Sequence, residues 1–257
     1  MIKWTSITNE EEKQFLKTAI AYNEKSEKQY RMLSTFFYNK EWMDEVLHKY
    51  NMQSAFNQYC FMGGYEYAER QVLVFGYDQS YMEMPICALK VTVKTGIGKA
   101  LTHRDFLGAL LGLGLKRETI GDILLKPFGA YVIVMKEMAE FIRCHLTGIG
   151  RYQKITVEEI SFSDMEVDPP RFKECLTTVP SLRVDAIFAA AFGLSRAEVV
   201  RYLQGDKGKV NGMFVTASHP MKVGDVGTLR GYGKMRLGAV NGTTKKDRLH
   251  ITIEKYI

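Results

Sequence analysis

The fold of the middle of the chain is decided by residues 102–135, THRDFLGALLGLGLKRETIGDILLKPFGAYVIVM. Thr102 and Asp105 have the spacing of a capping box, and apolar residues recur after them at helical spacing. Two apolar runs follow, near residues 119–125 and 130–135, and each is typical of a strand. The stretch therefore predicts one helix followed by two strands.

The same alternation of elements continues on either side of this stretch. Apolar or β-branched runs at 71–76 and 86–93 predict two strands before it, and a helix near 138–146 and a strand near 152–160 are expected after it. The order ββαββαβ contains βαββαβ, the unit of ferredoxin-like and RNA-recognition (RRM-like) folds. We therefore expect an α+β protein with an RRM-like middle domain over 65–162, a fold that by itself assigns no function.

Three further segments complete the predicted domain organisation. Helical spacing after the Thr8–Glu11 capping box predicts a helical N-terminal module over residues 1–64. The Pro169–Pro170 pair closes an acidic stretch and predicts a linker over 163–180. Two helical stretches, the second opening on a capping box, and several short strand-like runs then predict a helix pair on a small sheet over 181–257.

The charge of the chain is concentrated at one end. The 257 residues have a net charge of +6, and residues 181–257 hold 13 Lys and Arg against 6 Asp and Glu. Residues 1–180 hold 22 against 23 and are close to neutral. This asymmetry predicts a module that binds a polyanion. A basic surface without a partner is the alternative, because net charge governs association and not fold.

No catalytic or metal-binding motif is visible in the sequence. The HRD triplet at residues 103–105 lacks the Asn that a kinase has five positions later, where this chain has Leu110. The 4 cysteines and 5 histidines never have metal-ligand spacing. Neither the apolar core of a secretory signal nor a run of about 18 apolar residues is present. We therefore expect no catalytic residue, metal, cofactor, small-molecule substrate or membrane partner, and a cytoplasmic location.

Basic residues of the last module gather in three segments, at 194–212, 224–237 and 243–253. The first segment places an arginine at a helix N-terminus, which is typical of a phosphate site. The second sets basic residues among glycines that let a backbone approach closely. Such a pattern favours structured RNA, whose phosphates and shape are read more than its base edges. The candidate RNA-binding residues are Arg196, Arg201, Lys207, Lys209, Arg230, Lys234, Arg236, Lys245, Lys246 and Arg248.

A possible second RNA contact flanks the central helix. His103 and Arg104 lie at its start, and Lys116 and Arg117 follow its end. A cation in the first turn opposes the helix dipole, so Arg104 needs another reason to be there. Helix capping combined with solvated side chains is the alternative explanation for the four residues.

The last module resembles the S-four (αL-type) RNA-binding domain. The resemblance is carried by Leu182, Arg183 and Asp185, by Ser195 and Arg196, by Val210, Asn211 and Gly212, and by Arg230 and Gly231. It implies that Arg183, Ser195 and Asn211 belong to the RNA-binding site together with the basic residues named above.

Three other segments look like signatures of the YlmH family: GGYEYAER (63–70), THRDFLGALLGLGLKRETIGDIL (102–124) and TTKKDR (243–248). The resemblance implies a helical N-terminal part, an α+β middle domain that binds RNA and a C-terminal S-four domain. Members of this family are associated with the large ribosomal subunit and with rescue of stalled nascent-chain complexes, and were first noted near cell-division genes.

The sequence thus favours a non-enzymatic protein that binds structured ribosomal or transfer RNA on the large ribosomal subunit. One alternative is an RNA-modifying enzyme of the pseudouridine synthase or methyltransferase type, because S-four modules are also attached to such enzymes. The middle domain, however, has no glycine-rich methyl-donor loop and no obvious catalytic Asp. The other alternative is a cell-division scaffold for which RNA binding is secondary.

Overall fold

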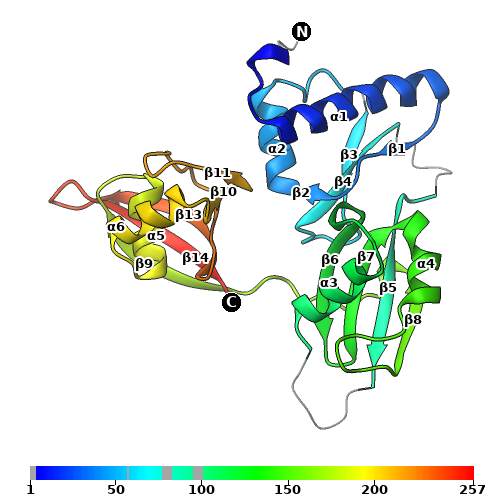
Figure 1. The fold of residues 1–257 in the computed structure, drawn as a ribbon. Coiled ribbons are helices and arrows are strands. Elements are labelled where there is room, and N and C mark those ends of the chain that lie inside the picture. The colour runs from blue at the N-terminus through cyan, green and yellow to red at the C-terminus, as the bar shows by residue number, and fades with distance from the viewer. Residues whose placement is uncertain (1–3, 57, 77–82, 95–100) are drawn as a thin grey trace. The chain divides into compact units, whose positions relative to one another are not determined.

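The computed structural model describes residues 4–56, 58–76, 83–94 and 101–257, and the chain divides into two compact units, Met1–Val167 and Asp168–Ile257 (Figure 1). Apolar side chains form separate buried clusters in the two units. No helix in the described part of the chain is long and apolar enough to cross a membrane.

The first third of the chain surrounds one buried strand, β4 (Arg70–Phe75), which pairs antiparallel with three short strands. The structure corrects the prediction of a wholly helical module over 1–64, because β3 and β4 pair across the predicted boundary at Gly64. The short strands escaped prediction since two of them are only 2 residues long. The other elements are η1 (Trp4–Ser6), α1 (Glu10–Gln29), β1 (Leu33–Ser34), β2 (Tyr38–Asn39), α2 (Lys40–Lys49) and β3 (Tyr59–Met62).

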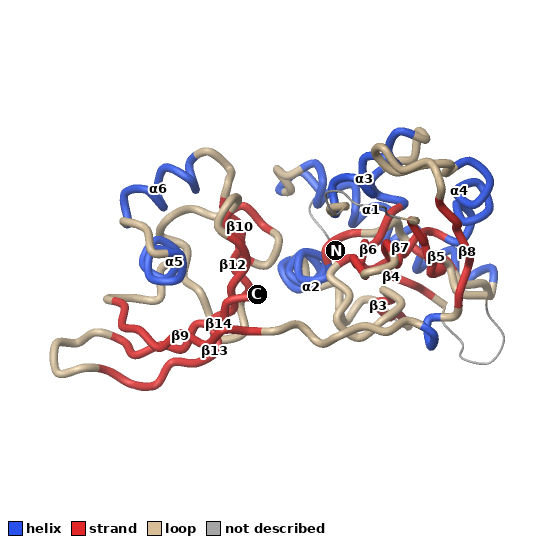
Figure 2. Tube along the Cα trace, turned by 90° about the horizontal axis from the view of Figure 1, so that it is seen from below, coloured by secondary structure: helices blue, strands red, loops and turns tan. Residues whose placement is uncertain are grey.

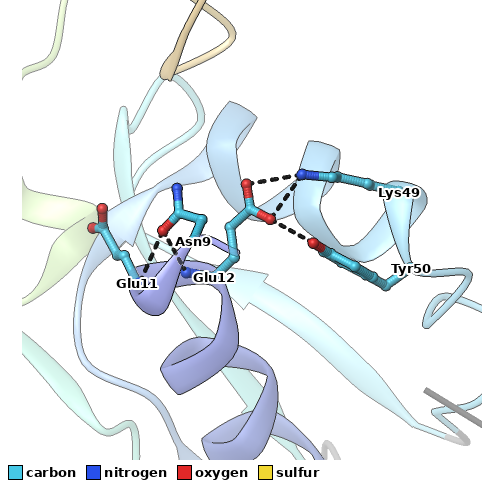
Figure 3. A network of polar contacts seen from close by, with 5 residues as sticks. All are labelled: Asn9, Glu11, Glu12, Lys49 and Tyr50. Atoms are coloured by element: carbon cyan, nitrogen blue, oxygen red, sulfur yellow. Dashed lines mark hydrogen bonds and ion pairs between the residues drawn. The ribbon is translucent and has the colours of Figure 1, made fainter. Parts of the chain in front are cut away.

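A polar network around Glu12 joins α1 to the end of α2 (Figure 3). Asn9 caps α1, since its Oδ1 accepts from two N–H groups of the first turn at 2.9 and 3.2 Å. The predicted cap, Thr8, is therefore wrong by one residue. The buried Glu12 carboxylate accepts from Lys49 Nζ at 2.8 Å and from the Tyr50 hydroxyl at 2.7 Å. This shared carboxylate fixes the two helices to one another.

The rest of the first unit, where it is described, forms a four-stranded antiparallel sheet with two α-helices, and the predicted βαββαβ order is confirmed. Its strand order is β6-β7-β5-β8. Asp105 Oδ2 accepts from the Thr102 N–H at 2.7 Å, so the predicted capping box is present at the start of α3. The elements are β5 (Ile86–Val93), α3 (His103–Gly112), η2 (Arg117–Thr119), β6 (Ile120–Lys126), β7 (Gly129–Met135), η3 (Lys136–Met138), α4 (Ala139–His145), β8 (Ile155–Ile160) and η4 (Phe162–Asp164).

Both faces of this middle sheet are covered. On one face, Leu89 of β5 packs in a cluster with Phe106 of α3 and Ile142 of α4. On the other face, the next residue along β5, Ala88, packs in a cluster with Val74 of β4. The N-terminal strands therefore occupy the sheet face that an RRM uses to stack bases.

The second unit is a six-stranded antiparallel sheet, ordered β11-β10-β12-β13-β14-β9, with two helices on one side (Figure 2). The capping box predicted at Ser195 and Glu198 is present at the start of α6. Strand β9 lies within the predicted 163–180 linker, which is corrected accordingly. The elements are β9 (Phe172–Val179), α5 (Val184–Phe192), α6 (Arg196–Gln204), β10 (Gly208–Val210), β11 (Met213–Phe214), β12 (Val226–Leu229), β13 (Gly233–Thr243) and β14 (Leu249–Tyr256).

Candidate nucleic-acid interface

Two arginines at adjoining helix starts share one buried carboxylate. Arg183 is the N-cap of α5 and Arg196 is the first residue of α6. The Asp185 side chain is 5% exposed; it accepts from Arg183 Nε at 3.2 Å, from Arg196 Nε at 3.2 Å and from Arg196 Nη2. The two arginine side chains are 46% and 51% exposed. They are therefore held in place while half of each side chain faces solvent.

The electrostatics of this pair keep Asp185 ionised. Burial acts to raise the pKa of Asp185, but the hydrogen bonds and charges of Arg196 and Arg183 outweigh it and hold the pKa below its usual value. One negative charge against two positive charges leaves the group cationic. Because a guanidinium has five N–H donors, donors remain that can bind a phosphate beside the two helix N-termini.

A second group of candidates surrounds the end of α6. Lys207 and Arg230 come from different turns, which are joined because the Arg230 N–H donates to the Lys207 carbonyl oxygen at 2.8 Å. Lys207 Nζ lies 5.4 Å from the centre of the Tyr202 ring, and the Tyr202 and Tyr232 hydroxyls are 3.1 Å apart. Together with the exposed Arg201, these residues form a helix-side cluster of cations and tyrosines; its members are Arg201, Tyr202, Lys207, Arg230 and Tyr232.

Other candidates lie on the opposite face of the same sheet. Lys209 Nζ is 4.3 Å from the centre of the Phe214 ring, and Lys234 Nζ is 4.8 Å from that of Tyr256. The Arg236 guanidinium lies 4.9 Å from the Phe172 ring and is paired with Glu254. The structure thus divides the sequence candidates between two surfaces. The aromatic partners were not among the candidates, although strand alternation in 208–214 and 249–256 could have indicated Phe214 and Tyr256.

Three of the remaining candidates make hydrogen bonds within the protein, and the other two are exposed lysines. Ser195 caps α6, and Asn211 adopts positive φ (48°) while its side chain donates to Asp225 and accepts from the Val226 N–H, both at 2.9 Å. Arg248 donates to the Thr178 carbonyl oxygen at 2.6 Å. The exposed pair at the tip between β13 and β14 is Lys245 and Lys246.

The four candidates for a second RNA contact, around α3, also differ in whether they present a positive charge to solvent. The Arg117 guanidinium donates to the Ile120 and Gly121 carbonyl oxygens, and burial lowers its pKa. Burial and the nearby Arg117 charge also lower the pKa of His103, which favours the neutral form of this imidazole. Arg104 and Lys116 are exposed, and Lys116 Nζ lies 3.9 Å from Glu118. Only these two keep cationic groups directed to solvent.

Two of the segments that resemble family signatures meet around Asp122. This carboxylate accepts from the Tyr65 hydroxyl at 2.8 Å and from the N–H groups of Glu69 and Arg70 at 2.7 and 3.2 Å. Burial raises the pKa of Asp122 against the effect of these hydrogen bonds. The Arg70 guanidinium donates to the carbonyl oxygens of Ile120 and Phe37 at 3.0 and 2.7 Å, and burial lowers its pKa to about 10. These signatures therefore join β4 to β6 and serve the fold.

The chain is similar to a known protein family, to a curated protein and, more distantly, to a solved structure. Residues 83–164 match a protein-family model described as "Putative RNA-binding domain in YlmH". The chain is 30% identical over 251 residues, 95% of each chain, to the "Ribosome-associated protein quality control protein P2" of Bacillus subtilis (strain 168). A solved structure, "Cell division protein ylmH from Streptococcus pneumoniae", is 19% identical with a TM-score of 0.49, over 63% of this chain and 98% of that one. The chain belongs to the YlmH family.

Proposed function

We propose that this protein is a non-enzymatic RNA-binding factor that engages structured ribosomal RNA and transfer RNA on the large ribosomal subunit, during rescue of stalled nascent-chain complexes in the cytoplasm. The observation that carries the proposal is the pair of half-exposed guanidiniums of Arg183 and Arg196, oriented by the buried Asp185. The ribosomal target is supported by the relative that is named a ribosome-associated quality control protein.

The chemistry of the proposed interaction is neutralisation of phosphates at fixed positions. The second unit, residues 168–257, holds 15 Lys and Arg against 8 Asp and Glu. The S-four resemblance assigns RNA contact to the helix starts, and the helix-side cluster adds cations next to them. Phosphate contacts of this kind read the shape of a folded RNA and not its sequence.

The candidate residues favour a protein that binds RNA without modifying it chemically. Within the part of the chain that is described, no three His, Cys, Asp or Glu side chains gather as a metal site would require. The Asp of the HRD triplet, Asp105, caps α3. A new modified nucleoside, found by mass spectrometry in ribosomal RNA incubated with the protein with or without a methyl donor, would instead assign the protein to the RNA-modifying enzymes.

The test is co-sedimentation of the full chain with purified ribosomal subunits in sucrose gradients. We expect the protein to travel with large subunits at low salt and to be released at high salt. If about 5 cations contact phosphates, log affinity falls against log salt with a slope of about −3.5 to −4.5. Recovery in the free fraction at low salt, or with small subunits alone, contradicts the proposed target.

Matched variants identify the contact surface. The double substitution Arg201→Ala and Lys207→Ala removes two exposed cations from the helix-side cluster. We expect it to weaken binding and to flatten the salt slope by about 1.4 to 1.8. The control, Lys17→Ala with Lys25→Ala, removes two exposed cations from α1. Equal effects of the two pairs would mean that general charge, and not this cluster, governs binding.

A further inference from the structure

Neighbouring residues of the C-terminal strands face opposite sides of the sheet. A Cβ atom built on Gly208 lies 2.4 Å from the Leu203 side chain of α6, and one built on Gly227 lies 2.4 Å from the Phe188 ring of α5. Both glycines therefore face the helices. Because side chains alternate along a strand, Lys209 and the residue after Gly227 point to the helix-free face.

A row of side chains crosses this helix-free face over all six strands. The strand register pairs Phe214 with Lys209, Lys209 with Thr228, and Thr228 with Lys234. Lys234 Nζ lies 4.8 Å from the Tyr256 ring, and Tyr256 is paired with a phenylalanine of β9. We call this set the outer row; in order from β11 to β9 it is Phe214, Lys209, Thr228, Lys234, Tyr256 and Phe172.

The outer row combines aromatic rings with cations. Lys209 Nζ is 4.3 Å from the centre of the Phe214 ring, which is 58% exposed. At the other end, the Phe172 and Tyr256 ring centres are 4.8 Å apart, and the Arg236 guanidinium lies 4.9 Å from the Phe172 ring. Neither helix of this unit covers this face, as Figure 2 shows. The rings are therefore presented beside positive charges and not enclosed in the core.

We propose that the outer row binds an unpaired segment of RNA. Its rings stack on exposed bases, and Lys209 and Lys234 contact the intervening phosphates, which is how proteins bind single strands. Arg236 is paired with Glu254 and is not counted among these contacts. Paired RNA is disfavoured, because its bases are stacked on one another and present no free face. An apolar protein partner is disfavoured as well, since it would remove the lysines from water without supplying opposite charge.

This inference extends the proposed function, on which it rests for RNA as the ligand. The helix starts and the outer row lie on opposite faces of one sheet. A folded RNA element on the first surface and an unpaired flanking strand on the second therefore do not compete for space. Two such contacts to one RNA raise its overall affinity, since the second binding event is intramolecular.

The experiment measures fluorescence anisotropy of labelled RNA with the full chain at constant salt. The probes are a 12-nucleotide oligouridylate and a blunt RNA hairpin with a fully paired stem. The variant is Phe214→Ala with Lys209→Gln, and the control, Tyr30→Ala with Lys25→Gln, removes a 93% exposed ring and an exposed lysine from the first unit. We expect the first pair to weaken oligouridylate binding about 10-fold or more, and hairpin binding less than about 2-fold.

A second variant gives a readout that loss of structure cannot imitate. Phe214→Trp keeps a stacking ring, so we expect it to retain oligouridylate affinity and its added fluorescence to be quenched by the oligomer, above the response of wild type. Unchanged oligouridylate affinity in the Phe214→Ala and Lys209→Gln variant overturns the inference, and so does an equal loss for both probes. If the wild-type protein binds oligouridylate but binds neither the hairpin nor ribosomes, the proposed function is contradicted instead.

Discussion

Replacing Asp185 with Asn separates net charge from orientation as causes of RNA binding. The substitution makes the C-terminal unit more positive by one charge, so an explanation based on net charge alone predicts tighter binding. The structure predicts the opposite, because the carboxylate holds the side chains of Arg183 and Arg196 in place. The sign of the change therefore decides between the two explanations.

The expected magnitude follows from the contacts. A hydrogen bond to a charged group contributes about 1.5–3 kcal/mol, and exposure of the partner reduces this toward about 1 kcal/mol. Asn keeps one acceptor oxygen, so we expect a loss of about 1–2 kcal/mol in the stability of the second unit. Each arginine released must be ordered again on binding, at about 0.5–1.5 kcal/mol. For two arginines the cost is about 1–3 kcal/mol, so RNA affinity should fall about 5- to 150-fold.

The assay is anisotropy of a structured fragment of large-subunit ribosomal RNA at fixed salt, with thermal melting as the check on folding. Asp206→Asn is the matched control, since it makes the same charge change at an exposed residue of the same unit. We expect this control to leave affinity equal or higher. If Asp185→Asn and Asp206→Asn tighten binding alike, orientation by Asp185 has no part in recognition.

Three further predictions concern stability. Asp122→Ala leaves the donors of Tyr65, Glu69 and Arg70 without an acceptor and should destabilise the first unit by about 3 kcal/mol in urea unfolding. The control, Asp164→Ala, changes an exposed residue and should cost less than about 0.5 kcal/mol. Gly227→Ala should destabilise the second unit by about 1–3 kcal/mol in thermal melting, because its Cβ would lie 2.4 Å from the Phe188 ring. Gly108→Ala in α3 has no atom within 4 Å of its Cβ, so it should stabilise the first unit by up to about 1 kcal/mol. Because the pKa of Asp185 is lowered on folding, its contribution to stability is present above the ordinary carboxyl pKa of about 3.9 and disappears as pH falls through the lowered value. Acid unfolding of Asp185→Asn should therefore lack the loss of stability that protonation of Asp185 causes in wild type. An identical acid transition in both proteins would contradict this prediction.

Local signals in the sequence located the helices well. The capping boxes at Thr102 and Ser195 are short-range patterns, and both are present in the structure. Strand β9 could not be found in the same way. Only alternate residues of FKECLTTV, such as Cys175 and Val179, pack on the core, and the residues of β14 that pair with this strand are 70 to 84 residues further along the chain. Its pairing is a tertiary effect that local periodicity does not contain.

The candidate site shows the same limit. Residue type and spacing identified the cations, but not which surface each one serves. Lys207 and Lys209 are two positions apart, yet one lies in the turn beside Tyr202 and the other on the helix-free face beside Phe214. Asn211, assigned to RNA by resemblance, has its side-chain amide engaged by Asp225 and Val226. Strand register and turn conformation determine the surface on which each of these side chains lies, and both depend on residues distant in the sequence.

The helix-free faces of the middle sheet and of the C-terminal sheet differ in whether they can contact RNA bases. A sheet of βαββαβ order suggests stacking of bases on its helix-free face, but here that face packs on β4, with Ala88 and Ile133 completely buried. Any contact of the middle domain with RNA must then come from its surface, where Arg104 and Lys116 are exposed. The C-terminal sheet has the reverse arrangement, because its helix-free face carries the exposed ring of Phe214 beside Lys209. We therefore expect base stacking in the second unit, and only charge-based contact from the middle domain.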